Sequence, residues 1–433
     1  MKTITYQAAE REEESVSAFL MMVLEYGHEI GLYALLSSKL KIAMKQVKYS
    51  LVNKAQTVIA SLVMGCGHTK AINETLEPER AAASYLGLER FPDQSQINRY
   101  LTRFSEDNVA QLGQVHLDMM VHQSRARQAA GWLVVDIDQC GLVANGKTYE
   151  FKRKGYFPRK RGEEGYQMSA AYIGAYEEAL QLYLDPGNAH CSQRLADLLR
   201  DMDGVLAADN PALKVICRLD AGYDTPTNRR LLLERSGYFL LKAHDTRLAR
   251  KLAQQVPLQD WLPVAEAVHG TELAPLDGCR RLLFEFFLPD GTLEYFLLLT
   301  NLPSDEFGLQ RCFTFYNERQ TIEAFFAQSR HVYNIQNLRS RKFNAIYAFL
   351  RFVFLTHNLI HWVKQVHFTH TPLAHASTQT LVRHIAQVRA RWSWDGKFNL
   401  FILPSNHWAS LLLDALHPRL IQLELPFARL YKT

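Results

Sequence analysis

Apolar residues recur with a helical spacing through residues 1–125 of the chain. Residues 15–36 and 55–64 are two apolar-rich stretches with this period, and a third helical stretch, 94–104, follows the turn sequence Phe91-Pro92-Asp93. Such spacing places the apolar side chains on one face of a helix, where they pack against a core. The pattern therefore predicts an all-helical domain over residues 1–125.

The pattern changes near residue 130, where short apolar runs alternate with helical stretches. Strands are predicted at residues 132–138, 167–173, 179–184, 213–219 and 238–243. Helices are predicted at residues 189–202 and 227–235. Strands followed by alternating helix and strand imply an α/β fold with a mixed sheet and helices packed on it.

A β-rich insertion is predicted within this region, over residues 245–305. The apolar runs 279–288 and 293–301 flank Pro289-Asp290-Gly291-Thr292, a sequence that favours a hairpin turn. The chain is then helical again from residue 313 to 365. We therefore expect a helical N-terminal domain (1–125), an α/β domain with its insertion (126–365) and a C-terminal region (366–433).

The composition narrows the class of protein. A hydrophobic content of 48% and a charged content of 21% are typical of a globular protein, and the net charge of +5 suits an acidic partner such as DNA. The six cysteines include no CxxC pair, which predicts reduced thiols in a cytoplasmic protein and argues against a zinc site. The acidic residues 10–14 predict that there is no signal peptide. The apolar stretch 347–363 contains Arg351, His357 and His361, so we expect a buried helix rather than a membrane span.

Carboxylates stand at the ends of two predicted strands. Asp136 and Asp138 lie on one face of their strand because side chains alternate with a period of two, and Asp220 follows strand 213–219. Each acid alone is explained by a structural role, such as a helix cap or a partner for Arg218. Two strands that deliver carboxylates to one sheet edge instead favour a magnesium site, because Mg²⁺ prefers oxygen ligands.

A helix predicted over residues 315–330 carries a row of polar side chains. At about 100° per residue, Tyr316, Arg319, Glu323 and Arg330 fall within an arc of about 60° on one helix. The aromatic and aliphatic residues of the segment occupy the neighbouring arc. An exposed ion-pair stripe also explains the row, because Arg319 and Glu323 are an i,i+4 pair.

The spacing Y-x2-R-x3-E-x6-R of this segment resembles the Y-x2-R-x3-E-x6-K motif of bacterial insertion-sequence DDE transposases. Other parts of that family's pattern appear in the same order along the chain. They are the strand-end Asp, the D-x-G-Y motif at Asp220, the β-rich insertion, Pro186-Gly187-Asn188-Ala189-His190, and Phe91-Pro92-Asp93-Gln94-Ser95 followed by Asn98-Arg99-Tyr100-Leu101. The family's Lys is Arg330 here, and its Ser or Thr two residues after the first Asp is Cys140.

The resemblance implies an RNase H-like catalytic core in which Asp138, Asp220 and Glu323 are the catalytic acids and bind two Mg²⁺ ions, with Mn²⁺ as a substitute. Aligning Cys140 with the family's Thr selects Asp138 over Asp136, which stays the alternative. The implied function is a DNA transposase that cleaves and joins phosphodiester bonds at mobile-element ends. The implied partners are double-stranded DNA at transposon ends and targets and a second copy of the chain on DNA, with no membrane, in the bacterial cytoplasm and at the nucleoid.

Several basic and aromatic residues are candidates for DNA contacts. The resemblance assigns phosphate contacts to Tyr316, Arg319 and Arg330, and Trp261 in the insertion either stacks on an unpaired base or packs in a turn. Two basic clusters are further candidates: Lys152, Arg153, Lys154, with Arg159, Lys160 and Arg161 beyond them, and Arg339, Arg341, Lys342. The helical N-terminal domain (1–125) is expected to bind DNA. Its lysines form either a solvated face or a grip on the DNA backbone: Lys39, Lys41, Lys45, Lys48, Lys54.

Two alternatives belong to other classes of protein. Residues 141–148, GLVANGKT, match the P-loop pattern of a nucleotide-hydrolysing ATPase, which requires a helix to begin at the Thr. The broken sequence 149–158 does not favour that helix, and Asn145-Gly146 favours a two-residue hairpin turn. The other alternative is a DNA-binding protein that makes no cut, which the presence of all three acids argues against.

Overall fold

The computed structural model describes residues 4–8, 15–45, 48–157, 162–206, 210, 212–288, 290–394 and 398–422. The chain divides into two compact units, each taken by itself below. Unit 1 comprises residues 1–123, 146–151 and 327–433, and unit 2 comprises residues 124–145 and 152–326. Because distant segments share a unit, the division differs from the three consecutive regions expected from the sequence.

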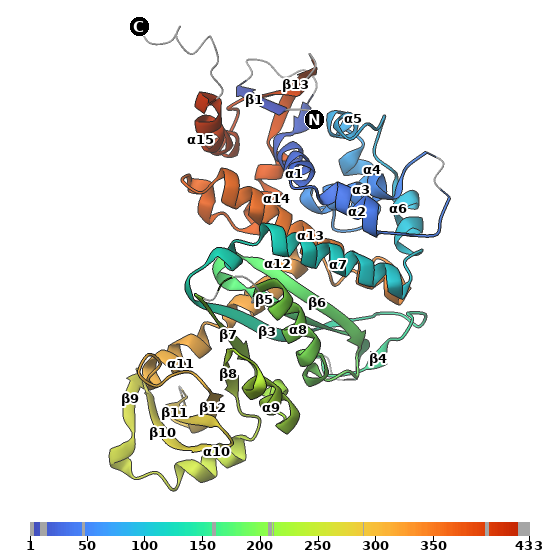
Figure 1. Cartoon of the computed structure of the whole chain (residues 1–433). Helices are drawn as coiled ribbons and strands as arrows, with labels where there is room; N and C mark the ends of the chain where they lie inside the picture. The colour runs from blue at the N-terminus through green and yellow to red at the C-terminus, as the bar shows by residue number, and fades with distance from the viewer. Residues whose placement is uncertain are drawn as a thin grey trace, which may run out of the picture. The chain divides into compact units, whose positions relative to one another are not determined.

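Unit 1 is built from helices of both chain ends (Figure 1). Its N-terminal helices are α1 (Ala18–Glu29), α2 (Leu32–Lys39), α3 (Leu51–Val63), α4 (Ala71–Leu76), α5 (Arg80–Tyr85), α6 (Gln94–Leu101) and α7 (Glu106–Gln123). Local sequence sets their starts: Ser17, Ser50 and Asp93 each accept hydrogen bonds from backbone N–H groups of the first turn. The C-terminal part adds α13 (Phe343–His367), α14 (Thr378–Arg383) and α15 (His407–Gln422).

The longest helix, α13, forms the core of unit 1. By length and hydropathy alone, α13 could cross a membrane. However, 83% of its most apolar 18-residue stretch is buried within the structure. Helices α1, α3, α6 and α7 pack against it. The predicted buried helix is therefore confirmed. Arg351 enters this core beside Gly113 of α7, where an added Cβ atom would lie 2.8 Å from the guanidinium carbon.

A small sheet in unit 1 joins the two ends of the chain. Its order is β1 (Ile4–Ala8), β14 (Phe398–Ile402), β13 (Arg389–Trp394) and β2 (Ser15–Ser17), and β1 runs parallel to β14. The N-terminal region is therefore helical apart from two short strands. Their pairing partners lie almost four hundred residues away, so no local pattern predicts them.

Unit 2 is organised around a mixed sheet, as the sequence predicts. Among the described residues the sheet has ten strands, and its central order is β6 (Glu178–Pro186), β5 (Glu164–Ile173), β3 (Gly131–Val143), β7 (Leu213–Leu219) and β8 (Tyr238–Lys242). Strands β3, β7 and β8 run parallel to one another, whereas β5 runs antiparallel to β3 and to β6. This is the strand order of an RNase H-like core. Helix α8 (Leu195–Leu206) packs on β5 and β6, and α9 (Pro226–Glu234) precedes β8.

The β-rich insertion continues this sheet. Strand β12 (Leu293–Thr300) pairs with β8, and β11 (Cys279–Phe287), β10 (Val268–Leu276) and β9 (Leu262–Ala265) follow in an antiparallel meander, with α10 (Thr246–Ala253) beside β12 (Figure 1). The predicted hairpin between β11 and β12 is confirmed by the pairing of Phe287 with Leu293. Phe284, Phe296 and Leu298 anchor the core of this region.

Candidate active site

Two carboxylates meet where the paired part of two parallel strands ends. The last aligned pair of β3 and β7 is Ile137 with Leu219, so Asp138 and Asp220 follow it in register. The sequence predicts that this strand ends at Asp138. In the structure, β3 continues to Val143 because β5 pairs with it on the other side. Asp138 is therefore held on a strand, and Asp220 leads into a short 3-10 turn whose first N–H, that of Ala221, it accepts at 2.7 Å.

A guanidinium group connects these acids to the third. Arg319 donates from Nη1 to Asp138 Oδ2 at 2.9 Å and from Nη2 to Glu323 Oε1 at 2.7 Å. The Tyr316 hydroxyl lies 3.4 Å from Asp220 Oδ1 and donates a hydrogen bond to it. The structure therefore gathers four of the predicted site residues around a fifth, Arg319: Asp138, Asp220, Tyr316 and Glu323.

The predicted single helix that carries these residues is broken. Helix α11 (Leu309–Asn317) ends at Glu318, and α12 (Gln320–Val332) begins after Arg319. The prediction of one continuous row is therefore wrong in geometry. Arg330 lies in the last turn of α12, in the part of the chain that belongs to unit 1, and it is not among the residues gathered in unit 2.

A buried ion pair fixes the helix break. Arg218 of β7 donates to both carboxylate oxygens of Asp136, at 2.6 and 2.8 Å. The same guanidinium donates to the backbone carbonyls of Phe315 and, at 3.1 Å, Glu318. It thereby binds the carbonyl end of α11, where the helix dipole favours a cation. The break follows from this tertiary contact, which no helical periodicity reveals.

Asp136 also anchors the first turn of α12. The Thr321 hydroxyl donates to Asp136 Oδ2, and Asp136 itself is fully buried. Gly174 lets Thr321 approach, because a Cβ atom there would lie 2.9 Å from the Thr321 hydroxyl oxygen. The carboxylate oxygens of Asp136, the alternative to Asp138, thus accept hydrogen bonds from Arg218 and Thr321. Asp138 remains partly exposed beside Asp220 and Arg319.

The electrostatics of the site favour a bound cation. Burial raises the pKa of Asp138 above its ordinary value, and the negative charge of Asp220 adds to this, while Arg319 opposes it. Burial also raises the pKa of Tyr316, with Asp220 adding to the effect. Within the described residues, the buried Tyr223 hydroxyl makes no hydrogen bond, and burial and the charge of Asp138 raise its pKa. Added positive charge would favour the ionised form of Asp138.

The donor set suits a hard divalent cation, because three carboxylates supply oxygen ligands. In the described part of the chain, however, no three acidic, cysteine or histidine side chains converge closely enough to hold an ion. Arg319 lies among the acids and pairs with two of them. It supplies the positive charge in this arrangement.

The P-loop alternative lacks its required structure. Gly141 lies within β3, where it pairs with Gln167 and packs against Phe157, and no helix begins at Thr148. The predicted two-residue hairpin at Asn145-Gly146 is also wrong. The next strand, β4 (Arg153–Lys154), pairs with β5 and not with β3, so residues 144–152 form a longer connection.

The other candidate DNA contacts have different surroundings. Lys152 pairs with Glu164, whereas Arg153 and Lys154 are exposed on β4. Arg341 and Lys342 are exposed, but Arg339 donates to the carbonyl of Cys66 and lies over the Phe349 ring, and burial lowers its pKa to about 10. Trp261 is half-buried near Tyr295. Arg159, Lys160 and Arg161 lie outside the described residues.

Three carboxylates from two neighbouring strands and a following helix are a donor set of the kind that divalent-metal enzymes use. The chain belongs to the family described as Transposase DDE domain group 1, which matches residues 14–425. It is accordingly a DDE-type enzyme of DNA transposition.

Among solved structures, the chain is similar to the piggyBac transposase in a cryo-EM structure of its synaptic complex with hairpin DNA. The identity is 13% and the TM-score 0.47, over 95% of this chain and 83% of that chain. No curated protein matches the chain.

Sequence reasoning missed the residues behind the acids. Arg218 was considered only as a partner for a strand-end acid, and Thr321 was not considered. An arginine two residues before Asp220, and a Thr between Arg319 and Glu323, give only a weak local signal. Their roles appear only when β3, β7 and α12 come together.

Proposed function

We propose that this enzyme cleaves and joins phosphodiester bonds at the ends of a mobile element, with Asp138, Asp220 and Glu323 as its catalytic acids. The observation that carries the proposal is the gathering of these three carboxylates around Arg319, two of them from adjacent strands in register. Asp136 is not one of the three, because Arg218 and Thr321 occupy its oxygens.

The family is generally dependent on a divalent metal, and here Asp138, Asp220 and Glu323 are the residues that would hold Mg²⁺ or Mn²⁺. Such ions activate the attacking oxygen and stabilise the leaving oxygen. The chain's own residues perform the rest. Asp138 and Asp220 are fixed by backbone N–H bonds from Gln139 and Ala221, so their oxygens do not reorganise freely during the reaction.

Arg319 and Tyr316 have a second task in this proposal. If the carboxylates held a metal, the Arg319 guanidinium would be free to bind a phosphate of the substrate, which its planar donors match. In this proposal Tyr316, which lies beside Asp220, helps to position the DNA strand that carries this phosphate. Double-stranded DNA is the proposed partner, and joining two ends of one element requires at least two copies of the chain on DNA.

The proposed function is tested with the DNA that flanks the protein's own coding region, carried on a supercoiled plasmid. We expect the full chain to cut this plasmid with Mg²⁺ or Mn²⁺ and not with EDTA, and to leave a plasmid without the flanking DNA uncut. Equal cutting of both plasmids would contradict an action at mobile-element ends.

The stability of the metal-free protein should depend on the ionisation of Asp138. Its pKa is raised in the folded state, so the folded chain binds more protons than the unfolded chain between the ordinary pKa near 4 and the raised value. The stabilisation is therefore complete at low pH and is lost as the pH rises through the raised pKa. In EDTA, the unfolding temperature of wild type should fall relative to that of Asp138→Asn over this window. If the difference in unfolding temperature between wild type and Asp138→Asn stayed constant with pH, a raised pKa of Asp138 in the folded protein would be refuted.

Lys147 should be dispensable for DNA cleavage. Because no helix begins at Thr148, the segment has no cradle for phosphates, and Lys147→Ala should leave cleavage within about two-fold of wild type. Equilibrium dialysis with labelled ATP should detect no binding. A measurable ATP affinity that disappears in Lys147→Ala would overturn this expectation.

A further inference from the structure

A basic hollow in unit 1 has no role in the chemistry above. Its volume is about 680 Å³, and the cationic side chains that line it come from α3, α6 and the segments beside them: Lys45, Lys48, Lys54, Arg99, Arg103. None of its described lining residues is acidic. We call this feature the Lys54 pocket.

Lys54 is the unusual member of the set. Its side chain is 2% exposed, and its only hydrogen-bond partner in the described part of the chain is the thioether sulfur of Met44 at 3.8 Å, a weak acceptor. Burial and the nearby charge of Arg99 lower its pKa. A buried ammonium group without a carboxylate partner is costly, and among the described residues no carboxylate pairs with Lys54.

The other cations stand at the mouth of the pocket. Lys45, Arg99 and Arg103 are exposed. Arg99 donates hydrogen bonds from Nε and Nη2 to Ser95. Among the described residues, its Nη1 makes no hydrogen bond. Lys48 pairs with Glu89 at 3.1 Å and lies over the Tyr49 ring at 5.8 Å, and because both charged side chains are largely exposed, that ion pair is weak and exchangeable.

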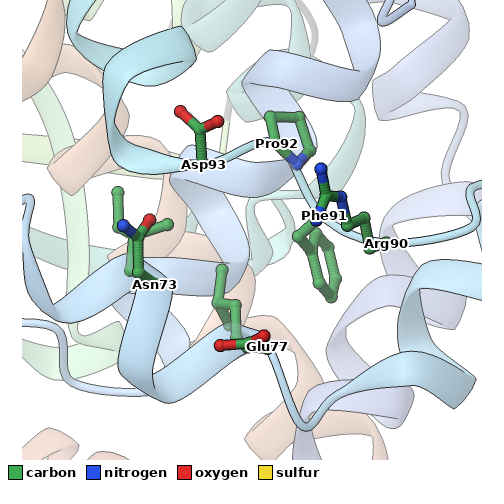
Figure 2. Close-up of a pocket in the computed structure, with 8 residues that line it drawn as sticks. Asn73, Glu77, Arg90, Phe91, Pro92 and Asp93 are labelled. Atoms are coloured by element: carbon green, nitrogen blue, oxygen red, sulfur yellow. The ribbon is translucent and has the colours of Figure 1, made fainter.

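A second hollow in unit 1 shows the contrast. It measures about 190 Å³, and Figure 2 shows the carboxylates of Glu77 and Asp93 around it together with Arg90. Two acids against one arginine do not attract an anion. Asp93 is moreover committed to the first turn of α6, where it accepts from the N–H groups of Ser95 and Gln96.

We infer that the Lys54 pocket binds a phosphate group of a nucleic-acid backbone, at a site in unit 1 made of residues other than the catalytic acids. An oxyanion supplies the acceptors that Lys54 lacks, and the exposed cations neutralise the phosphates on either side. A backbone is favoured over a free nucleotide because the only aromatic ring in the described lining, that of Tyr49, is buried and offers no stacking face. The choice of DNA as the nucleic acid rests on the proposed function.

The test measures binding of a fluorescent DNA duplex of random sequence to the full chain as a function of salt. Lys54→Met should weaken binding by roughly ten-fold and reduce the slope of log affinity against log salt by about one. Lys70→Met is the matched control, since Lys70 is an exposed lysine of the same unit and does not line the pocket, and it should change binding by less than about two-fold. An unchanged affinity and slope in Lys54→Met would overturn the inference.

Two further measurements distinguish a loss of binding from a loss of folding, and a backbone site from a free-anion site. Lys54→Met should not lower the unfolding temperature, because it removes a buried charge without a carboxylate partner. If it does unfold the protein, the double variant Arg99→Gln, Arg103→Gln takes its place, with the same expected loss of binding. Inorganic phosphate that competes with the duplex at low millimolar concentration, but only in wild type, would show a free-anion site and contradict the backbone proposal.

The outcome is independent of catalysis. If the Lys54→Met variant binds random DNA normally while wild type cuts its own flanking DNA, only the proposal that the Lys54 pocket binds DNA is refuted. Conversely, if wild type binds DNA through Lys54 but cuts no DNA, the proposed function is refuted and the proposal for the Lys54 pocket stands.

Discussion

Glu323→Gln is expected to reduce DNA strand cleavage by several orders of magnitude while DNA binding survives. The substitution keeps the size of the side chain and its hydrogen-bonding oxygen, but it removes one of the three negative charges that two dications require. Glu323 is largely exposed, and its ion-pair partner is Arg319, so little stability is lost with it, about 0.5 kcal/mol. Cleavage of the plasmid with its flanking DNA and binding of the same DNA are the two measurements.

Glu234→Gln is the matched control for this prediction. Glu234 is an exposed acid at the end of α9 in the same unit, and it does not belong to the gathered residues. It should cleave like wild type. If Glu323 were only part of a surface ion pair, the two variants would behave alike, and normal cleavage by Glu323→Gln with Mg²⁺ would refute the proposed mechanism.

If Asp138 and Glu323 hold a metal, Arg319 would no longer pair with them as it does in the metal-free protein. Glu323→Gln weakens the hold of the site on Arg319 and on the metal together, so its response to Mg²⁺ is informative. Mg²⁺ should raise the unfolding temperature of wild type more than that of Glu323→Gln, since ligand binding stabilises only the folded state that it recognises.

The strands of unit 2 were predictable because each is short, apolar and bounded by turn residues. Strand β7 has the predicted bounds, 213–219, and β8 and β12 differ by a single residue at one end. Local chemistry decides such elements. The position of Asp220 after β7 was predictable for the same reason, whereas β3 continues past Asp138 to Val143.

The helix break at Arg319 was not predictable from the chain alone. Residues 315–330 have the spacing of one helix, and the feature that ends α11 is Arg218, a residue of β7 that binds the carbonyls of Phe315 and Glu318. The parallel pairing of β1 with β14 is invisible for a related reason. Both depend on contacts between segments far apart in the sequence, for which periodicity carries no information.

The sequence likewise does not distinguish the surroundings of Asp136 from those of Asp138. In the sequence they differ only by two positions on one strand face, and the family pattern is weak there. In the fold they have different neighbours. Asp136 is buried under Thr321 and Arg218, while Asp138 shares Arg319 with Glu323.

Asp136→Asn should therefore destabilise unit 2 strongly, and this is the second large effect expected. Removing one partner of a buried ion pair leaves the other charge uncompensated and costs about 3–5 kcal/mol. For a unit of this size that lowers the unfolding temperature by roughly 10 °C. Cleavage should fall because Arg218 no longer holds the end of α11, and with it Arg319, in place.

The comparison with Glu323→Gln distinguishes a positioning residue from a catalytic one. A catalytic Asp136 would give an inactive variant with normal stability, as expected for Glu323→Gln. A positioning Asp136 gives an unstable variant whose activity loss shrinks at low temperature, where more of the protein is folded. Thermal unfolding and cleavage assays at two temperatures on both variants separate these outcomes.

A double variant sharpens the same test. Arg218→Met combined with Asp136→Asn removes both buried charges, so it should be more stable than Asp136→Asn alone. The recovery should be incomplete, because the carbonyls of Phe315 and Glu318 lose their donor, at about 1–3 kcal/mol for each buried group left unsatisfied. A double variant no more stable than Asp136→Asn would mean that the ion pair is not what holds α11 and α12 against the sheet, and the position of Arg319 would then need another cause.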